Sequence, residues 1–323
     1  LRLVAGALAN GLVPGTTARG PRAVVTALEP ALRWVPLLGA PALGRVHQVL
    51  LQTIGARRGQ GSWFTPASLA DAVAELALAP LLARGAAAPR VLDPACGSGR
   101  VLVAALDVLA RAALLRGDAR TLVAARRAAL RALHGVDLDP AAVALARAAL
   151  ASHARVSPDE VDVRAADALA RRWPERFDAV IGNPPWRRER GARDALEGAR
   201  RTRVGRHARA RTDLWMLFAH LALDLLRDGG TNAFVAPGYW LRGAGAGPAH
   251  LRERLHTEAR WRALADLGRL DRFEGGGAGA RAVVYAVERG AAAEAADVDA
   301  WTVAPRADPG ALARALRTGR GRD

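Results

Sequence analysis

The sequence predicts an α/β protein with a doubly wound, mostly parallel sheet, and three observations lead to this fold class. From Arg90 onward, short apolar runs alternate with longer stretches whose apolar residues recur at helical spacing. Gly and Ala are abundant while aromatic residues make up 5% of the chain, which favours helices over a β-sandwich. With 323 residues, 51% of them hydrophobic, the chain can bury one large core. Strands and helices that alternate in this way form right-handed βαβ units.

The elements follow from these patterns in chain order. Helices are expected at residues 43–52, 66–82, 101–115, 121–133, 140–150, 213–226 and 251–259. Strands are expected at residues 91–92, 135–138, 161–163, 177–182, 232–236 and 282–287. Residues 1–57 are apolar but interrupted by prolines, so they allow only short helices. The Arg-rich run 187–211 shows little hydrophobic periodicity and is predicted to be a mobile loop.

The charge of the chain indicates a polyanionic partner. The formal net charge is +16, and all 47 basic residues are arginines. Arginine binds phosphate with two parallel hydrogen bonds, so nucleic acid is the natural partner. The alternative is a biased surface, because a GC-rich coding sequence would also enrich the chain in Arg, Ala and Gly.

Cysteine and histidine usage points to a reducing compartment and away from a metal. Cys96 is the single cysteine, which excludes an intramolecular disulfide and fits a cytoplasmic location. The seven histidines are scattered without cysteine partners at metal-ligand spacing, so no metal site is expected. The apolar start is broken at Gly6, Gly11 and Pro14, well short of a membrane span.

The first candidate site is the turn from Asp93 to Gly99, which joins an expected strand to an expected helix. A strand, a Gly-rich turn and a helix N-terminus place backbone N–H groups against a ligand's carboxylate or phosphate. Gly97 and Gly99 would remove side chains that block this approach. The ordinary alternative is a tight turn that binds nothing, since glycine-rich turns alone are weak indicators.

Asp137 ends the next expected strand and is the second candidate. An acidic residue at this place in a doubly wound nucleotide site accepts hydrogen bonds from both ribose hydroxyls. Leu138 would then lie against an adenine face. A lone aspartate is more often a helix cap, and Asp139, before Pro140, is expected to be such a cap.

The third candidate is the tetrapeptide Asn183-Pro184-Pro185-Trp186, directly after the strand expected at 177–182. Doubly wound folds place ligands at the carboxyl ends of strands. An Asn side-chain oxygen and a proline carbonyl can together accept both hydrogens of an amino group, and Trp186 offers a flat face for a ring. The tetrapeptide therefore indicates a site for a planar amine or amide nitrogen. The alternative is a rigid turn at a strand end.

Taken in order, these motifs resemble the gamma class of adenine-N6 DNA methyltransferases, in particular the methylase domains of type IIG restriction–modification enzymes. The resemblance covers roughly residues 43–289. Gly61–Pro66, which contains Thr65 and Pro66, resembles the family's Gly-x-x-x-Thr-Pro run near the cofactor's methionine part. Residues 93–99 match the cofactor loop without a departure, and residues 135–140 resemble the ribose-binding turn.

The resemblance implies a seven-stranded, Rossmann-like fold that binds S-adenosylmethionine and transfers its methyl group to the N6 atom of adenine in double-stranded DNA. The cofactor-binding residues it implies are Thr65, Pro66, Asp93, Ala95, Cys96, Gly97, Gly99, Asp137, Leu138 and Asp167. The catalytic residues it implies are Asn183, Pro184, Pro185 and Trp186. The target adenine would be flipped out of the duplex between Trp186 and Phe273. Arg187, Arg188 and Arg190 would grip the neighbouring phosphates.

The resemblance also sets the expected domain organisation. We expect an N-terminal helical segment at 1–57, a methyltransferase domain at 58–290 and a tail at 291–323. Full-length members carry a target-recognition domain after this region, and the tail is too short to form one. The expected protein is therefore a methylase core of a restriction–modification or phage-defence system. It would need a missing C-terminal part or a separate specificity subunit, and the chain itself could be an excised piece.

Three alternatives remain open. A methyltransferase that acts on protein glutamine also uses an Asn-Pro-Pro motif to hold an amide nitrogen, but it lacks the Thr-Pro lead-in. An RNA base methyltransferase would explain the arginine content equally well. The third alternative is an inactive, truncated DNA-binding remnant that keeps the fold without turnover.

Overall fold

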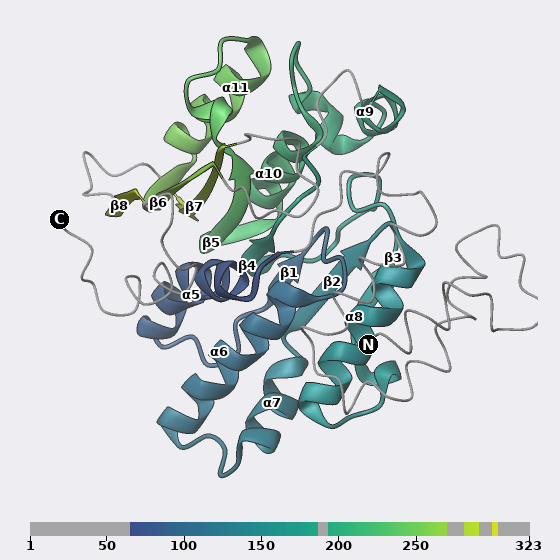
Figure 1. Ribbon diagram of the computed structural model, residues 1–323, viewed down its shortest axis with the longest axis vertical. Coiled ribbons are helices and arrows are strands. Elements are labelled where there is room, and N and C mark those ends of the chain that lie inside the picture. The colour runs from purple at the N-terminus through teal and green to yellow at the C-terminus, as the bar shows by residue number, and fades with distance from the viewer. Residues whose placement is uncertain (1–64, 187–192, 270–280, 291–298, 303–323) are drawn as a thin grey trace, which may run out of the picture.

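A computed structural model describes residues 65–186, 193–269, 281–290 and 299–302. Within these ranges, one eight-stranded sheet has the order β3-β2-β1-β4-β5-β7-β6-β8 (Figure 1). The strands are β1 (Val91–Asp93), β2 (Leu133–Asp137), β3 (Val163–Ala165), β4 (Phe177–Gly182), β5 (Leu226–Pro237), β6 (Ala259–Arg269), β7 (Arg281–Arg289) and β8 (Asp299–Thr302).

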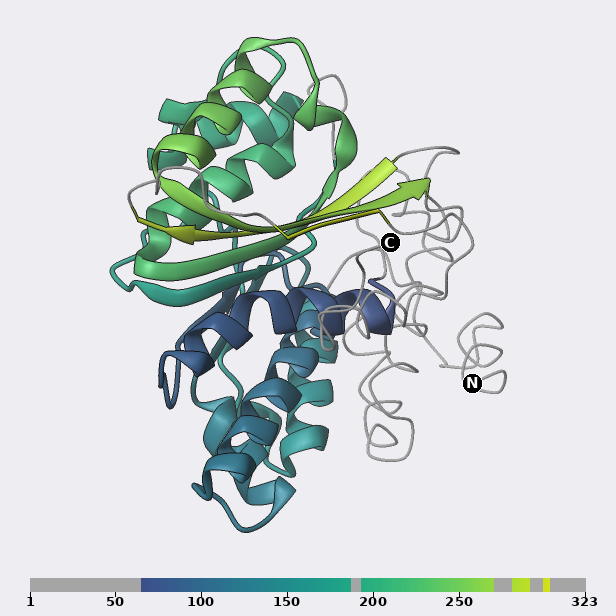
Figure 2. The same cartoon turned by 90° about the vertical axis from the view of Figure 1, so that its left-hand side faces the viewer.

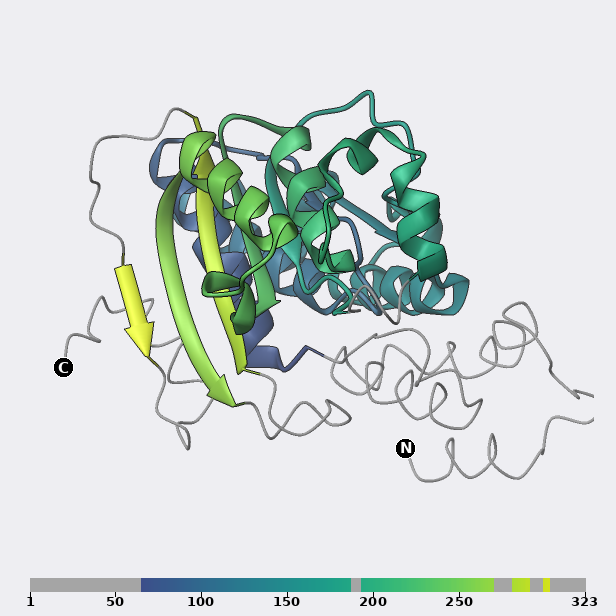
Figure 3. The same cartoon turned by 90° about the horizontal axis from the view of Figure 1, so that it is seen from above.

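Strands β1 to β5 pair in parallel, and β7 is antiparallel to both of its neighbours, β5 and β6. The chain order reverses beside β1, which is the crevice where doubly wound sheets bind ligands. The predicted doubly wound, mostly parallel α/β fold is confirmed. Strand β8 extends the seven expected strands at the β6 edge, where it pairs in parallel (Figure 3).

The helices form a layer on each face of the sheet. Figure 2 shows α5 to α8 on one face and α9 to α11 on the other. Their bounds are α5 (Ala67–Ala83), α6 (Arg100–Arg116), α7 (Leu122–Leu130), α8 (Pro140–Ala154), α9 (Arg193–Arg200), α10 (Leu214–Leu225) and α11 (Ala246–Thr257). Three short 3₁₀ turns are η1 (Pro158–Glu160), η3 (Arg203–His207) and η4 (Gly238–Leu241). Each face of the sheet therefore has its own hydrophobic core.

The strand side chains alternate between these two cores. In β4, Ala179 and Ile181 pack into the core under α5, α6 and α8, whereas Val180 packs into the core under α10. In β7, Val284 and Tyr285 likewise point to opposite faces. Because parallel strands covered on both faces are apolar throughout, they appear in the sequence as continuous runs.

Local sequence signals explain where the helices begin. The Asp139 side chain accepts a hydrogen bond from the Ala141 N–H at 2.9 Å, and Pro140 occupies the first turn of α8. The Thr121 hydroxyl accepts one from the Ala124 N–H at 3.2 Å and so caps α7. The sequence predicted the first of these caps. No helix in the described part of the chain has the length and apolar character needed to cross a membrane.

The structure differs from the predictions made from the sequence in three places. The Arg-rich run predicted as a loop contains α9 and η3, in which Leu196, Ala199 and Val204 are buried. Helix α11 begins earlier than expected, and Ala259, predicted at its end, starts β6 instead. Strand β6 itself was not predicted, since a single residue, Glu258, separates it from the helix. The helix expected at 43–52 lies outside the described residues.

Candidate active site

The carboxyl ends of β1, β2 and β4 bring Asp93, Asp137 and Asn183 to one edge of the sheet. Leu92 lies opposite Val180, and Asp93 lies opposite Gly135, so the three strand ends are close to level. Asp93 and Asn183 are 90 positions apart in the sequence, with Asp137 between them. The parallel register of the strands makes the three residues neighbours.

Gly182 lets Asp93 and the end of β4 approach closely. A Cβ atom on Gly182 would lie 2.7 Å from Asp93 Oδ1, and Gly182 has a φ of 150°. Real Cβ atoms do not come this close to another heavy atom, so only glycine fits here. The sequence analysis placed Gly182 at a strand end without assigning it this role.

The loop after β1 is fixed by backbone hydrogen bonds. The Ala95 N–H donates to Asp93 Oδ1 at 3.1 Å, and the Gly97 N–H donates to Asp137 Oδ2 at 2.8 Å. The Cys96 N–H donates to the Val136 carbonyl at 3.0 Å. The predicted Gly-rich turn is therefore tied to the ends of both β1 and β2.

The two glycines of this loop have different roles. Gly97 has a φ of 53°, and a Cβ there would meet nothing within 4 Å, so its face of the loop is open. Gly99 has a φ of 82°, and its Cβ would lie 3.0 Å from the Cα and Cβ of Ala146 in α8. The sequence suggested that both glycines clear space for a ligand. In the structure Gly97 is suited to that role, whereas Gly99 lets α6 start against α8.

The Asp93 carboxyl is almost fully buried, which sets its protonation. Burial raises its pKa to about 8, against the lowering effect of the Ala95 N–H, and the nearby Asp137 carboxylate raises it further. Burial and these two carboxylates also raise the pKa of the Cys96 thiol. Asp93 is thus mainly neutral at pH 7, and a cationic ligand nearby would favour its ionisation.

Asp137 and Leu138 face the same edge. Asp137 Oδ1 accepts a hydrogen bond from the Asp139 N–H at 2.9 Å, while Oδ2 holds Gly97. Leu138 is 74% exposed, so its apolar side chain is accessible at this edge. Both placements agree with the predicted site for a ribose and an adenine.

Asp167 also lies beyond a strand end, after β3. Its Oδ1 accepts hydrogen bonds from the Leu169 N–H at 2.9 Å and the Ala170 N–H at 3.4 Å. This carboxylate is exposed, and its second oxygen accepts no hydrogen bond from the described residues. Oδ1 of Asp167 caps its own turn, whereas Oδ2 is available to a ligand.

Asn183 has the most distinctive environment at this edge. Its Nδ2 donates to Thr65 Oγ1 at 3.3 Å, whereas its Oδ1 is buried and has no hydrogen-bond partner among the described residues. A buried amide oxygen without a partner costs about 1–3 kcal/mol. Such a cost persists at sites where a ligand supplies the missing donor. Asn183 therefore presents an acceptor that is fixed in place and unused.

The rest of the tetrapeptide supports this side chain. Pro184 is buried, and Pro185 is partly buried. Trp186 packs against both hydrophobic cores. Thr65 is itself buried, directly before the start of α5, and the Pro66 carbonyl accepts the Leu69 and Ala70 N–H groups. Phe273, Arg187, Arg188 and Arg190, also predicted here, lie outside the described residues.

The Thr65 hydroxyl holds the Asn183 amide, which leads to a first prediction. Thr65→Val removes the hydroxyl with little change in shape, and we expect it to lower kcat about tenfold through loss of one hydrogen bond. The affinity for the cofactor should change less than about twofold, because the hydroxyl acts through Asn183.

Serine at position 65 is the matched control, since Thr65→Ser keeps the hydroxyl. Stopped-flow turnover and titration calorimetry measure the two quantities. A Val variant that loses cofactor affinity while keeping kcat would instead make Thr65 a cofactor contact, as the sequence resemblance implied.

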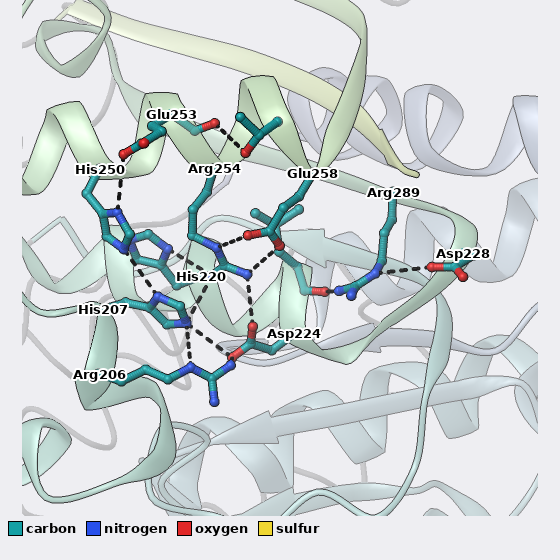
Figure 4. Close-up of polar contacts among 12 residues, drawn as sticks. Arg206, His207, His220, Asp224, Asp228, His250, Glu253, Arg254, Glu258 and Arg289 are labelled. Atoms are coloured by element: carbon teal, nitrogen blue, oxygen red, sulfur yellow. Dashed lines mark hydrogen bonds and ion pairs between the residues drawn. The ribbon is translucent and has the colours of Figure 1, made fainter. Parts of the chain in front are cut away.

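Three histidines that are scattered in the sequence meet where η3, α10 and α11 come together (Figure 4). His207 of η3, His220 of α10 and His250 of α11 have ring nitrogens within 4.8 Å of one another. The Arg254 guanidinium lies 3.1 Å from both His207 Nε2 and His220 Nδ1, where a metal ion would have to bind. The rings of His207 and His220 are stacked, 4.6 Å apart and 11° from parallel. Lone pairs in the planes of parallel rings do not converge on one ion.

Arg254 links this cluster, the histidine cluster, to two carboxylates. Its Nη2 donates to Asp224 at 3.0 Å and to Glu258 at 2.7 Å. Burial, the neighbouring His207 and the Arg254 charge lower the pKa of His220 well below its ordinary value. The cluster therefore joins α10, α11 and η3 through contacts of the Arg254 guanidinium with two of the rings and two carboxylates.

A second prediction follows from the depressed pKa of His220. The unfolded chain takes up a proton near pH 6.5, and the folded His220 resists it. Stability contributed by the neutral ring is therefore present above pH 6.5 and is lost as the pH falls toward the folded pKa. The loss reaches at most about 1.4 kcal/mol per pH unit for this residue.

Urea unfolding between about pH 7.5 and about pH 5.5 measures this effect. Carboxylates with ordinary pKa values titrate below this window, and the raised pKa of Asp93 is common to the wild type and the variant compared with it. His220→Gln keeps an acceptor for Arg254 but cannot titrate, so its stability should fall less steeply over this window. Equal slopes for the two proteins would show that His220 does not carry the effect.

The chain was compared with protein families and solved structures. The family model described as N-6 DNA methylase matches residues 40–268. A protein from Listeria monocytogenes, described as a class I S-adenosylmethionine-dependent methyltransferase, is 18% identical with a TM-score of 0.63; the match covers 97% of this chain and 88% of that one. These values show a shared fold.

Two restriction–modification proteins are also similar in structure. The modification subunit of a type I restriction enzyme from Vibrio vulnificus is 17% identical with a TM-score of 0.56, over 91% of this chain and 55% of that one. The type IIG restriction endonuclease BpuSI is 17% identical with a TM-score of 0.62, over 88% of this chain and 32% of that one. The chain thus spans about half and one third of these two proteins.

Proposed function

Because the chain belongs to the N-6 DNA methylase family, we propose that it transfers a methyl group from S-adenosylmethionine to the N6 amino group of adenine in DNA. The observation that carries the proposal is the buried, unpartnered Oδ1 of Asn183 at the end of β4. A planar amine supplies the donor that this oxygen lacks.

The edge of the sheet is suited to the cofactor in three respects. The open face at Gly97 leaves space for a ligand against the backbone of the loop. Asp137 and the exposed Leu138 offer a carboxylate for a ribose and an apolar face for an adenine. A positive charge nearby would stabilise the ionised form of the Asp93 carboxyl, which burial disfavours. When bound, S-adenosylmethionine supplies an electrophilic methyl group on a sulfonium.

The chain's own residues would then orient the nucleophile. Asn183 Oδ1 and the Pro184 carbonyl accept the two amine hydrogens, which directs the nitrogen lone pair out of the plane of the base. The Thr65 hydroxyl keeps the Asn183 amide in the orientation that leaves Oδ1 free. Positioning of this kind lowers the barrier because the amine no longer has to be reoriented in the transition state.

The target base has to leave the duplex to reach Asn183, since a stacked adenine is inaccessible. We propose that it stacks between Trp186 and Phe273, and that Arg187, Arg188 and Arg190 bind the adjacent phosphates. The net charge of +16 supports a polyanionic substrate of this kind.

Target choice would rest on a further domain or a separate specificity subunit of a restriction–modification system. The similar Vibrio vulnificus protein is a modification subunit, which supports the second arrangement. We keep the division into segments 1–57, 58–290 and 291–323 as part of this proposal.

A tritiated methyl-transfer assay tests the proposal by offering DNA, RNA and protein in parallel. Nucleoside analysis of the labelled DNA should give N6-methyladenine. Label in RNA or in glutamine side chains would identify another methyltransferase activity. Binding of S-adenosylmethionine without any transfer would support an inactive DNA-binding remnant.

A further inference from the structure

A cavity of ≈460 Å³ lies between the β3–β4 connection and the turn from α9 to η3. Its charged lining consists of Arg171, Arg172, Arg176, Arg201, Arg203 and Asp224. Arg176 directly precedes β4, and Asp224 lies two residues before β5. The cavity therefore lies at the amino ends of these strands, whereas Asn183 lies at the carboxyl end of β4.

The single carboxylate in this lining is already neutralised from outside the cavity. Asp224 Oδ2 accepts a hydrogen bond from Arg206 Nη2 at 2.8 Å, and Oδ1 accepts one from Arg254 Nη2 at 3.0 Å (Figure 4). Neither of these arginines lines the cavity. Asp224 thus does little to offset the five lining guanidinium groups.

Two of the five have specific partners, and the one charged partner among these is Glu175, which forms an ion pair with Arg171. Arg176 Nη1 donates to the backbone carbonyl of Asp224. The Arg171 guanidinium lies 4.7 Å from the centre of the Trp173 ring, which also lines the cavity, and its Nε is buried without a hydrogen-bond partner. The nearest carboxylate to Arg171, that of Glu175, is 4.0 Å away.

The other three carry their charge without compensation. Within the described residues, the side chains of Arg172, Arg201 and Arg203 form neither ion pairs nor hydrogen bonds. Arg201 and Arg203 follow α9, and Arg172 belongs to the β3–β4 connection. The fold therefore brings three positive charges from two separate segments to the same cavity. The three side chains are exposed, and like charges gathered around one hollow create a positive potential that attracts anions.

We propose that this cavity binds a phosphate-bearing anion. Guanidinium groups bind phosphate oxygens through paired hydrogen bonds, and the volume is in the range of small-molecule sites. The phosphate belongs either to a free polyphosphate or to a nucleic-acid backbone. The site is separate from the edge that holds Asn183, and it does not depend on methyl transfer.

Titration calorimetry of the full chain with inorganic tripolyphosphate tests the site. We expect saturable binding to one site, weakened at least about tenfold in the triple variant Arg172→Ala/Arg201→Ala/Arg203→Ala. The control triple, Arg120→Ala/Arg131→Ala/Arg242→Ala, removes the same charge from exposed arginines that do not line the cavity, and it should weaken binding by less than about twofold.

A lysine triple at positions 172, 201 and 203 keeps the charge but loses the planar fork, and its affinity should lie between wild type and the alanine triple. This variant also keeps the test decisive if the alanine triple does not fold. Absence of saturable binding in the wild type, or equal weakening in the pocket and control triples, would overturn the proposal.

A labelled DNA duplex distinguishes the two sources of phosphate by fluorescence anisotropy. If the backbone occupies the cavity, tripolyphosphate should displace the duplex, and the pocket triple should bind it more weakly than the control triple. If a free polyphosphate occupies it, both triples should bind the duplex equally. Neither arm uses methyl transfer, so failure of the proposed catalytic function leaves this test unaffected.

Discussion

Asn183→Ala should lower the rate of methyl transfer by about a thousandfold or more, while cofactor binding stays within about twofold. The substitution removes a buried acceptor that has no hydrogen-bond partner among the residues that the structure describes. Without it, the amine can rotate freely and loses a hydrogen bond that strengthens as the nitrogen becomes positively charged in the transition state. Single-turnover kinetics and titration calorimetry separate the two effects.

The chain offers a matched control on the neighbouring strand. Asn232 of β5 is fully buried, and its Nδ2 donates to the Val180 carbonyl at 2.9 Å. Asn232→Ala should reduce the free energy of unfolding by about 1–3 kcal/mol without a comparable loss of rate per folded molecule. If the two variants lose rate and stability in parallel, Asn183 has a structural role only.

The sequence predicts β1 and β4 well because these central parallel strands are buried on both faces. Strand β4 occupies the predicted residues, and its apolar run ends at Gly182, where the backbone requires glycine. Helix α9 was missed for the opposite reason. Among the side chains of α9 that the structure describes, Leu196 and Ala199 are buried, which gives too short an apolar pattern to stand out among arginines.

The site was predicted residue by residue, but its contacts were not. Thr65 and Asn183 are separated by 118 positions, and nothing local indicates that one holds the other's amide. The histidine cluster is also invisible in the sequence, because His207, His220 and His250 lie on three separate elements without a motif spacing. Both arrangements arise from contacts between distant parts of the chain, so they cannot be predicted from local sequence patterns.

Asp137 accepts hydrogen bonds from the protein backbone, and it is also the residue expected to accept them from a ribose. Its two oxygens each accept a hydrogen bond from a backbone N–H, of Gly97 and of Asp139. Each carboxylate oxygen has a second lone pair, so a ribose can bind without displacing either contact. Asp137 therefore shapes the loop, and the role of ribose acceptor is part of the proposed function.

Asp137→Ala should weaken binding of S-adenosylmethionine by about 1–3 kcal/mol, or roughly five- to 150-fold, since it removes charge-assisted hydrogen bonds. The loop at Gly97 also loses its anchor, so part of the loss reflects disorder of the open face. Because the Asp137 charge raises the pKa of Asp93, the variant should lower that pKa toward its ordinary value. Calorimetry over a range of pH measures both effects.

Asp139→Ala is the control, because it removes the same charge two residues away. Asp139 caps α8 through the Ala141 N–H, so its loss should cost about 1 kcal/mol of stability and leave cofactor affinity within about twofold. Equal affinity losses in the two variants would mean that negative charge near α8, and not the position of Asp137, governs binding. A loss confined to Asp137→Ala places the cofactor's ribose at the end of β2.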